Sequence, residues 1–291
     1  MSGVVGSVAT LSRFPVKSMQ GERLPEAEFT DGGLVGDRAY ALVETETGKV
    51  MSGKHPRVGA LLLGCRATFV EAPRDGGEAP PVGITLPDGT VVTSDERDAD
   101  STLSAFLGRE VTLQRAAPED FMIDHYDPDL DPEGDRGTVT ESRLGAAAFA
   151  RAGMPSPVPA GSFFDAFPVS VLTTSTLLRL QTLRPETRFD ERRFRMNIVV
   201  DTPEDGFIEN EWPGRSLEIG DTVRLTVFIS DPRCVMTTLA QDDLPKDTEV
   251  LRTLARHNRI NVAGGHYPCA GVYAVVETAG TTRAGDPVSL T

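Results

Sequence analysis

The sequence is poor in cysteine and has no long apolar run. Its three cysteines, Cys65, Cys234 and Cys269, are far apart in the chain. Neither a disulfide framework nor a CxxC metal site, which needs thiolates at short spacing, is therefore expected. No stretch approaches the roughly 18 apolar residues that cross a bilayer, and the first ten residues lack a basic segment followed by an apolar one. These absences predict a cytoplasmic protein without a membrane span.

Basic residues are also scarce. Lys and Arg total 29 against 43 Asp and Glu, so the formal net charge is −14. Such a surface repels nucleic-acid phosphates and anionic membranes unless basic residues are concentrated at one place. The sequence contains no GxSxG, HExxH or GxxxxGK(S/T) pattern, which argues against serine hydrolases, zinc peptidases and P-loop nucleotide enzymes. Neither a nucleic-acid partner nor a membrane partner is expected.

Short β-branched segments separated by Gly, Asp and Pro make up much of the chain, a pattern typical of barrels or sandwiches. Helical periodicity is confined to a few stretches, such as Leu103, Phe106 and Leu107, which are followed by Gly108. We therefore predict a mainly β fold with some α. Strands are expected at 4–11, 38–44, 61–70, 83–86, 90–93, 111–114, 169–172, 197–201, 223–229 and 271–277, and helices near 103–107, after 140, at 177–183 and at 247–258.

An acidic, turn-rich stretch divides the chain. Residues 118–141 contain nine acidic residues and one arginine, which is typical of a solvated linker. The regularly spaced acids at 127–133 suggest a calcium loop. However, Pro132 stands where the sharp turn of such a loop needs Gly, and Thr138 replaces its bidentate Glu, so a solvated loop is preferred. The predicted organisation is a domain at 1–117, a linker at 118–141 and a domain at 142–291.

One basic cluster stands out in this acidic chain. The arginines of the RRFR run at 192–195 precede an apolar strand, and strand alternation would place Arg193, Arg195 and Asn197 on one face. Guanidinium groups bind phosphate or carboxylate through paired hydrogen bonds. The alternative is a surface salt-bridge patch with the neighbouring acids.

One cysteine has a basic neighbour. Cys234 follows the predicted strand 223–229 and stands beside Arg233. A nearby cation favours the thiolate, which is both a nucleophile and a soft metal ligand. Cys65 and Cys269 lie in apolar segments and are expected to be buried thiols without a chemical role. Cys234 is therefore the candidate for chemistry, and a buried structural thiol is the alternative.

Several segments together resemble the MOSC family, named for the C-terminal domain of molybdenum cofactor sulfurase, and within it the amidoxime-reducing components and their bacterial relatives. The resemblance covers nearly the whole chain. It implies two β-barrel-type domains with peripheral helices. The segments that carry it, in the family's order, are RFPVKSMQG, GGLVGDRAYALVE, FPVSVLTTSTLLRL, RRFRMNIVVD, FIENEW, LEIGD, DPRCVMTT and GVYAVVETAGTTRAGDPV.

The resemblance implies an enzyme that uses the molybdenum cofactor, in which one pterin dithiolene and one protein cysteine bind the metal. Cys234 matches that metal ligand and is the implied catalytic residue. The other matches lie in segments that contact the cofactor in the family. They are Lys17 and Ser18 in the first turn, Arg38 in the GDR turn, Asp165, Arg195, Asn197 and Arg233.

The chain departs from the family pattern at two places. Phe167 stands just before Pro168, where the members closest to the amidoxime reducers carry polar residues, so their hydroxyl donors are absent here. Met196 replaces the usual proline between Arg195 and Asn197.

The leading hypothesis is a molybdenum-dependent oxidoreductase that reduces N-oxygenated compounds, such as amidoximes and other N-hydroxylated bases. The cysteine spacing of a plant-type ferredoxin domain is absent, so electrons are expected from a separate ferredoxin-type or flavoprotein-type donor. Two alternatives remain open. Cys234 could carry a persulfide in a sulfur carrier or sulfurtransferase, or the protein could carry the molybdenum cofactor without catalysis.

Overall fold

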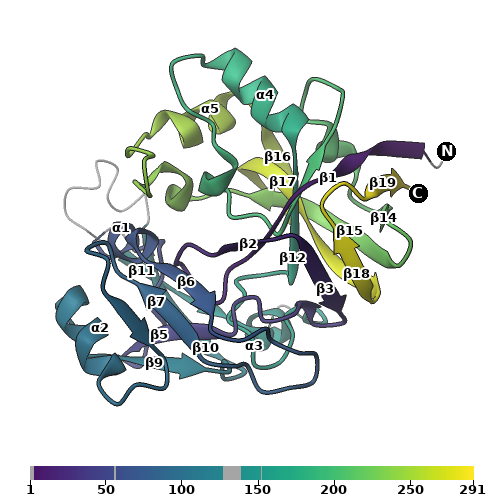
Figure 1. Ribbon diagram of the computed structural model, residues 1–291. Coiled ribbons are helices and arrows are strands. Elements are labelled where there is room, and N and C mark those ends of the chain that lie inside the picture. Colours follow the sequence, from purple (N-terminus) through teal and green to yellow (C-terminus); the bar gives the residue numbers. More distant parts are fainter. Residues whose placement is uncertain (1–2, 56, 127–138, 152) are drawn as a thin grey trace.

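Strands dominate both halves of the chain, and most helices lie at the periphery (Figure 1). The computed structural model describes residues 3–55, 57–126, 139–151 and 153–291. The predicted mainly β class with some α is confirmed. Within the described ranges, no helix combines the length and apolar character that a bilayer crossing requires.

A closed barrel forms most of the second half of the chain and includes the first strand. β1 lies between β13 and β19, and β12 pairs with both β13 and β17. The ring therefore runs β12-β13-β1-β19-β14-β15-β17 and closes on itself, with β2 and β16 attached to it. Its interior is packed with apolar side chains such as Val8, Val171 and Leu225. The bounds are β1 Gly3–Arg13, β2 Glu22–Leu24, β12 Val169–Thr173, β13 Ile198–Asp201, β14 Ser216–Ile219, β15 Val223–Pro232, β16 Arg259–Val262, β17 Gly265–Thr278 and β19 Pro287–Leu290.

The N-terminal lobe has a separate core and smaller sheets. Leu42, Leu62, Ile84 and Leu103 pack together in this core. The sheets of this lobe are β5-β9, β6-β7-β8 and β10-β11. A further sheet, β18-β3-β4, joins a strand from the end of the chain to two from the first half, and Phe29 and Leu34 of this sheet pack in the barrel core. The bounds are β3 Glu26–Thr30, β4 Gly33–Leu34, β5 Tyr40–Glu44, β6 Arg66–Phe69, β7 Val82–Thr85, β8 Val91–Thr93, β9 Val111–Arg115, β10 Phe121–Tyr126, β11 Val139–Leu144 and β18 Gly280–Arg283.

The helices are short and have recognisable ends. α2 ends at Gly108, whose φ of 65° is a left-handed cap that glycine adopts without strain. At the start of α4 the Thr173 hydroxyl accepts a hydrogen bond from the Thr176 N–H at 3.1 Å. α4 and α5 pack on the outside of the barrel through Leu180 and Leu254. The bounds are α1 Gly59–Gly64, α2 Ala99–Leu107, α3 Ala146–Arg151, α4 Thr174–Leu183 and α5 Glu249–His257, with 3-10 turns η1 Glu191–Arg193, η2 Ile208–Glu211 and η3 Val235–Thr238.

The strand predicted at 61–70 is wrong in its first half. The leucines of this run belong to α1, and only β6 is extended. Leucine is a good helix former and lacks the β-branching that favours strands. A short apolar run therefore does not distinguish the two structures by periodicity. The apolar character of the run does predict burial correctly, because Leu62 and Leu63 are buried.

The predicted linker 118–141 contains regular structure. β10 and β11 pair as antiparallel strands over six residue pairs. Residues 127–138, which include the acids considered for calcium, lie outside the described residues. The boundaries at 117 and 142 stay predictions, and the pairing of β1 with β13 and β19 shows that the two halves share one barrel.

Candidate functional site

One cavity brings together all the site residues predicted from the sequence. Its walls are loops that follow β1, precede β5, β12 and β13, and follow β15, so segments far apart in the chain meet there. The predicted residues that line it are Lys17, Ser18, Arg38, Asp165, Arg195, Asn197, Arg233 and Cys234.

The cavity is basic although the protein is acidic. Six cationic side chains and two carboxylates line it, a formal charge of 6 − 2 = +4, whereas the whole chain carries −14. Local concentration of cations attracts an anionic ligand more strongly than the net charge suggests. The cations are Lys17, Arg38, Lys54, Arg193, Arg195 and Arg233, and the carboxylates are Asp165 and Asp231.

Three residues of the wall have a left-handed backbone. The φ angles are 66° at Ser18, 50° at Arg38 and 56° at Arg195. Residues other than glycine adopt this conformation rarely, at a cost of about 1–2 kcal/mol each, and it tends to persist at ligand sites. The Ser18 hydroxyl also accepts a hydrogen bond from the Gly53 N–H at 2.9 Å. This bond ties the first turn to the loop that carries Lys54.

Two lysines enclose the carboxylate of Asp165. Lys17 bonds one oxygen of Asp165 and donates to the backbone carbonyl of Phe163 at 2.8 Å, and Lys54 Nζ lies 2.7 Å from Asp165 Oδ2. Burial alone would raise the pKa of Asp165, but the two ammonium groups bring it far below its ordinary value. Burial lowers the pKa of Lys17 despite this partner. For Lys54, the effect of burial is outweighed by Asp165 and Cys234, which raise its pKa. Asp165 therefore orients both lysines at the cavity wall.

Two guanidinium groups lie over the ring of Phe14. The Cζ atoms of Arg38 and Arg195 are 4.5 Å and 4.4 Å from its centroid. Arg38 pairs with Asp37 and donates to the backbone carbonyl of Arg195 at 3.3 Å, and Arg195 donates to the carbonyl of Met19. Burial and the charge of Arg38 lower the pKa of Arg195 to about 9. A bound anion would relieve this repulsion.

Asn197 faces the cavity but uses its whole amide within the protein. Its Oδ1 accepts hydrogen bonds from the backbone N–H of Ser170 at 3.1 Å and from the hydroxyl of Ser170 at 3.0 Å. Its Nδ2 donates to Asp37 at 2.8 Å and to the carbonyl of Ser12 at 3.3 Å. An amide has no further donor or acceptor. Asn197 therefore positions β1, β12 and the turn that carries Arg38.

Arg233 and Asp231 each have a buried polar atom without a partner. Arg233 bonds Asp231 and donates to the carbonyl of Phe194 at 2.5 Å, but its Nε and the Asp231 Oδ1 atom make no hydrogen bond. Burial raises the pKa of Asp231 to about 6, although Arg233 acts against it. Burial and the charge of Asp231 raise the pKa of Tyr273, which lines the same cavity. Buried polar atoms without partners are uncommon, and a ligand or water in the cavity would supply the partner that these two lack.

Cys234 is the accessible thiol. Cys65 and Cys269 are 1% and 0% exposed, and burial raises their pKa values to about 12 and about 11. Their predicted burial is confirmed. Cys234 is partly exposed, lines the cavity and stands at the start of η3.

The predicted strand alternation of Arg193, Arg195 and Asn197 is wrong. Arg193 ends η1, Arg195 has a left-handed backbone, and β13 begins only at Ile198. The three residues still line one cavity because the turn, rather than a strand face, directs them there. Arg193 itself is 1% exposed, and backbone carbonyls accept all its hydrogen bonds. Those carbonyls belong to Arg188, Thr237, Leu239 and Pro245.

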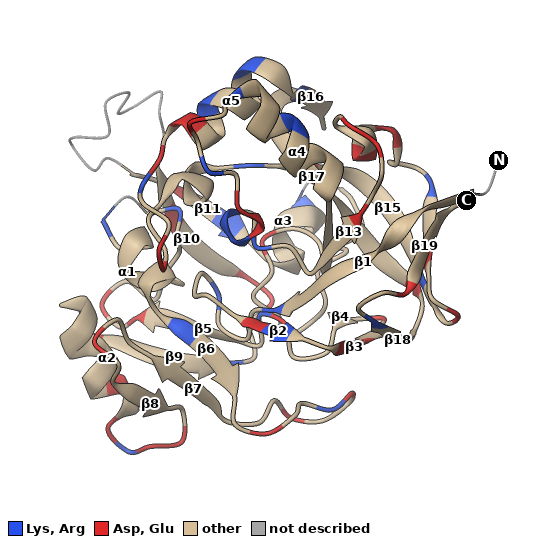
Figure 2. Cartoon of the chain, turned by 45° about the horizontal axis from the view of Figure 1, so that its top comes forward, with Lys and Arg blue, Asp and Glu red and all other residues tan. Residues whose placement is uncertain are grey.

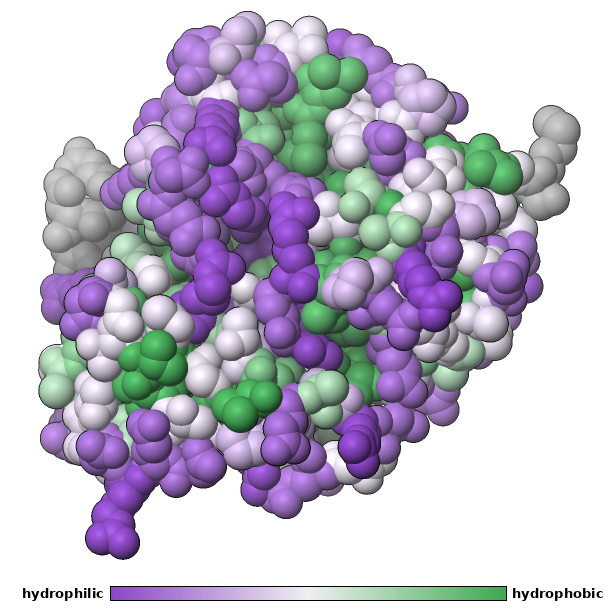
Figure 3. Space-filling view, viewed as in Figure 1, coloured by the Kyte–Doolittle hydropathy of each residue, from purple (hydrophilic) through white to green (hydrophobic). Residues whose placement is uncertain are grey.

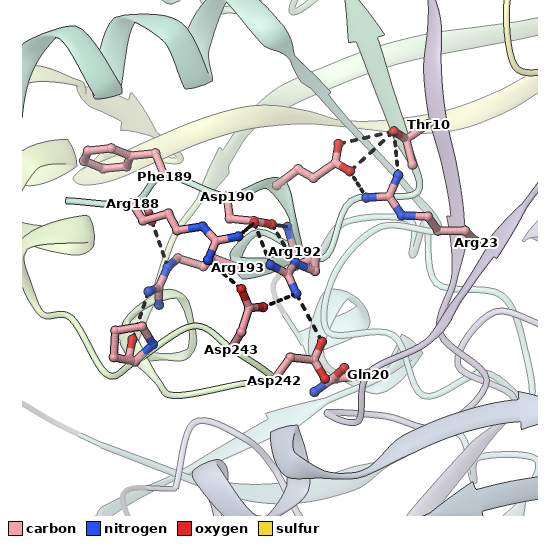
Figure 4. A network of polar contacts seen from close by, with 12 residues as sticks. Thr10, Gln20, Arg23, Arg188, Phe189, Asp190, Arg192, Arg193, Asp242 and Asp243 are labelled. Carbon is pink, nitrogen blue, oxygen red and sulfur yellow. Dashed lines mark hydrogen bonds and ion pairs between the residues drawn. The ribbon is translucent and has the colours of Figure 1, made fainter. Parts of the chain in front are cut away.

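The salt-bridge alternative is correct for Arg192. It pairs with Asp190, Asp242 and Asp243 in the network of Figure 4. Acidic and basic segments alternate where the barrel meets the N-terminal lobe (Figure 2), and hydrophilic residues gather along the middle of the face in Figure 3. Arg192 is thus surrounded by carboxylates, whereas the adjacent Arg193 is surrounded by backbone carbonyls.

Sequence reasoning missed Lys54, Asp231 and Tyr273. Lys54 lies in a loop without a recognised motif. The other two could have been found by pairing two predicted strands, because Tyr273 of β17 pairs with Ile229 of β15, the strand that contains Asp231. Among the described residues, no group of three or more His, Cys, Asp or Glu side chains could hold a metal ion by itself.

The end loops of the closed barrel surround a basic cavity that contains one accessible thiol. These features define a class of mainly β proteins in which the cavity suits an anionic ligand next to a cysteine. The chain belongs to the MOSC-domain family. Residues 5–108 match the MOSC N-terminal beta barrel domain, and residues 159–289 match the MOSC domain.

Curated relatives span most of the chain. Mitochondrial amidoxime-reducing component 1 of Homo sapiens is 27% identical over 307 aligned residues, which cover 98% of this chain and 83% of the relative. Mitochondrial amidoxime reducing component 2 of Rattus norvegicus is 25% identical over 296, with the same coverages. The crystal structure of the YUAD protein from Bacillus subtilis aligns with 100% of this chain and 97% of its own, at a TM-score of 0.46 and 11% identity.

Proposed function

We propose that the protein binds the molybdenum cofactor in this cavity and reduces N-oxygenated compounds such as amidoximes. The observation that carries the proposal is the concentration of six cations around one accessible thiol. Membership of the MOSC family and similarity to relatives named amidoxime-reducing components support it.

The donor set of the cavity fits such a cofactor. Guanidinium and ammonium groups suit its phosphate, and the unpartnered Nε of Arg233 is a free donor. A thiolate suits a soft metal, and Cys234 is the partly exposed thiol of the cavity, with Lys54 and Arg233 in the same lining. The residues proposed to hold the cofactor are Lys17, Ser18, Arg38, Arg195, Arg233 and, at the metal, Cys234; Asp165 and Asn197 would position them.

When bound, the cofactor would supply two-electron redox chemistry at the N–O bond. Overall, an amidoxime, two electrons and two protons give an amidine and water. The protein would supply protons and exclude competing water. Asp231 is suited to hold a proton near neutral pH, at the Oδ1 atom that has no partner, because burial raises its pKa to about 6.

The electrons are proposed to come from a separate redox protein. A plant-type iron–sulfur cluster needs four cysteines, and the chain has three, of which two are buried. In this proposal each turnover includes an encounter with a ferredoxin-type or flavoprotein-type donor.

The first test measures molybdenum and released pterin per chain after expression in a host that makes the cofactor. The wild type is expected to contain both at close to one per chain. Cys234→Ser should lose most of the metal, whereas the control Cys65→Ala, outside the cavity, should keep it. A wild type without metal and pterin would overturn the proposal.

The second test measures reduction of benzamidoxime to benzamidine with reduced methyl viologen as the donor. Turnover by the metal-loaded wild type is expected, with loss of turnover in Cys234→Ser. Full metal loading without turnover would favour a noncatalytic carrier of the cofactor. A metal-free protein in which Cys234 takes the outer sulfur of a donor persulfide, with release of the donor as a thiol, would favour sulfur transfer.

A further inference from the structure

Four aromatic rings form a continuous wall that extends outward from the cavity. Phe167 is at its centre. Its ring centroid lies 5.5 Å from that of Tyr273, with the planes inclined by 20°, and 5.6 Å from that of Phe228. Phe149 meets Phe167 edge-on, at 6.2 Å and 84°. The rings come from α3, the segment before β12, β15 and β17, so the tertiary structure assembles the wall.

The wall connects the cavity with the surface. Phe167 and Tyr273 line the cavity and are partly exposed. Phe228 is 50% exposed. A contiguous apolar surface beside a polar cavity is a common feature of ligand sites.

The outward position of Phe228 is not explained by the barrel core. Along β15, Leu225 and Val227 are buried, whereas Thr226 and Phe228 belong to the alternate, outward series. A polar side chain would be expected at this outward, exposed position of the strand. The phenyl ring instead packs on Phe167, outside the barrel.

Cationic and aromatic side chains both line the cavity. Lys17, Arg38 and Arg195 are among the cationic ones, and Phe167 and Tyr273 are among the aromatic ones. Tyr273 pairs with Ile229 of β15, the strand that leads to Cys234, which lines the same cavity. The aromatic wall therefore begins close to the proposed reacting centre.

We propose that this wall binds a planar aromatic group of the substrate, so that aromatic N-oxygenated compounds are preferred to aliphatic ones. This inference rests on the proposed function and names the substrate class within it. Phe167 is partly exposed although it contacts three rings, and a substrate ring that packs against its exposed part would lose apolar surface to the wall and gain an aromatic contact. Phe167 is then a specificity-determining residue.

The test compares benzamidoxime with acetamidoxime, which has the same reacting group without the ring. Phe167→Leu keeps an apolar side chain of similar size but removes the aromatic face. We expect it to raise the KM for benzamidoxime about tenfold, with kcat and the KM for acetamidoxime changed less than about twofold. Phe228→Ala should also raise the KM for benzamidoxime but not for acetamidoxime, by a smaller factor than Phe167→Leu. Leu178→Ala, an exposed apolar residue of α4, is the control and should change neither substrate.

Equilibrium binding separates this inference from the proposed function. Saturation-transfer NMR gives Kd for both compounds without turnover. A wild type that reduces neither compound refutes the proposed function, and the wall is then judged from Kd alone. Selective weakening of benzamidoxime binding by Phe167→Leu supports the wall. Equal effects on both compounds, or none, overturn it even if the enzyme is active.

Discussion

At the residue scale, adjacent arginines have different roles. Arg192 pairs with surface acids, Arg193 is buried among backbone carbonyls, and Arg195 faces the cavity over Phe14. The sequence indicates that this cluster is a candidate anion site, because basic clusters are unusual in an acidic chain. It does not predict which arginine is buried, since burial is decided by segments more than 40 residues away, such as the loop that contains Pro245.

Asp231 should make stability depend on pH in an unusual direction. Burial raises the pKa of its carboxyl from 3.8 to about 6, so between these values the folded state binds more protons than the unfolded state. The contribution to stability is complete below pH 4 and is lost as the pH rises through 6. Asp231→Asn does not titrate. The free energy of unfolding of Asp231→Asn, relative to wild type, should therefore rise between pH 4 and pH 7, by on the order of 1–3 kcal/mol.

Urea unfolding at both pH values measures this difference. Asp243→Asn is the control, because its pKa is lowered to about 2 by hydrogen bonds from Arg188 and Arg192. The stability that Asp243 contributes is present above pH 4 and is lost only as the pH falls further, through about 2, so the effect of Asp243→Asn should be nearly the same at pH 4 and pH 7. Parallel pH profiles for Asp231→Asn and wild type would contradict the prediction.

At the scale of elements, regular pieces were predictable and the functional turns were not. Periodicity and Gly108 identify α2, and alternation identifies β15. Strand alternation is a wrong prediction for the turn before β13, because the left-handed backbone of Arg195 leaves no signature in a residue type other than glycine. That conformation is imposed by packing from outside the segment.

Arg193 should stabilise the segment that carries Cys234. Its guanidinium donates to one carbonyl within η3, at Thr237, and to two that follow it, at Leu239 and Pro245. Arg193→Lys would leave several buried carbonyls without a partner and should lower the free energy of unfolding by about 2–4 kcal/mol. Metal retention should fall with it.

The matched control is the adjacent Arg192→Lys. Arg192 forms partly exposed ion pairs, so its substitution should change stability by less than about 1 kcal/mol. Urea unfolding of both variants, with molybdenum content alongside, makes the comparison. Equal effects of the two substitutions would refute the bracing role of Arg193.

At the scale of the whole molecule, the mainly β class was predictable and the strand order was not. Local patterns locate β1, β13 and eight other strands and miss shorter ones such as β3, β14 and β19, and the two barrel neighbours of β1, β13 and β19, are 187 or more residues away along the chain. Nothing within the segment itself specifies them. The same is true of the cavity, since eight of its residues were predictable through family resemblance and others, such as Lys54, lie outside any recognised motif.

The shared barrel predicts that the two halves unfold together. β1 fills the gap between β13 and β19, and β3 pairs with β18. A fragment of residues 142–291 would have two unpaired strand edges and an open core. It should lack a sharp thermal transition, whereas the full chain should unfold in a single step with equal calorimetric and van't Hoff enthalpies.

A rearranged chain tests the cause of this behaviour. Gly3 pairs with Leu290 in the antiparallel register of β1 and β19, so a short Gly-Ser turn after Thr291 can lead directly into β1. We expect residues 142–291 followed by such a turn and residues 3–24 to regain a cooperative transition and to aggregate less than the bare fragment, because β1 then returns to its place. If the bare fragment unfolds as cooperatively as the rearranged chain, β1 is dispensable and the C-terminal half is an independent domain.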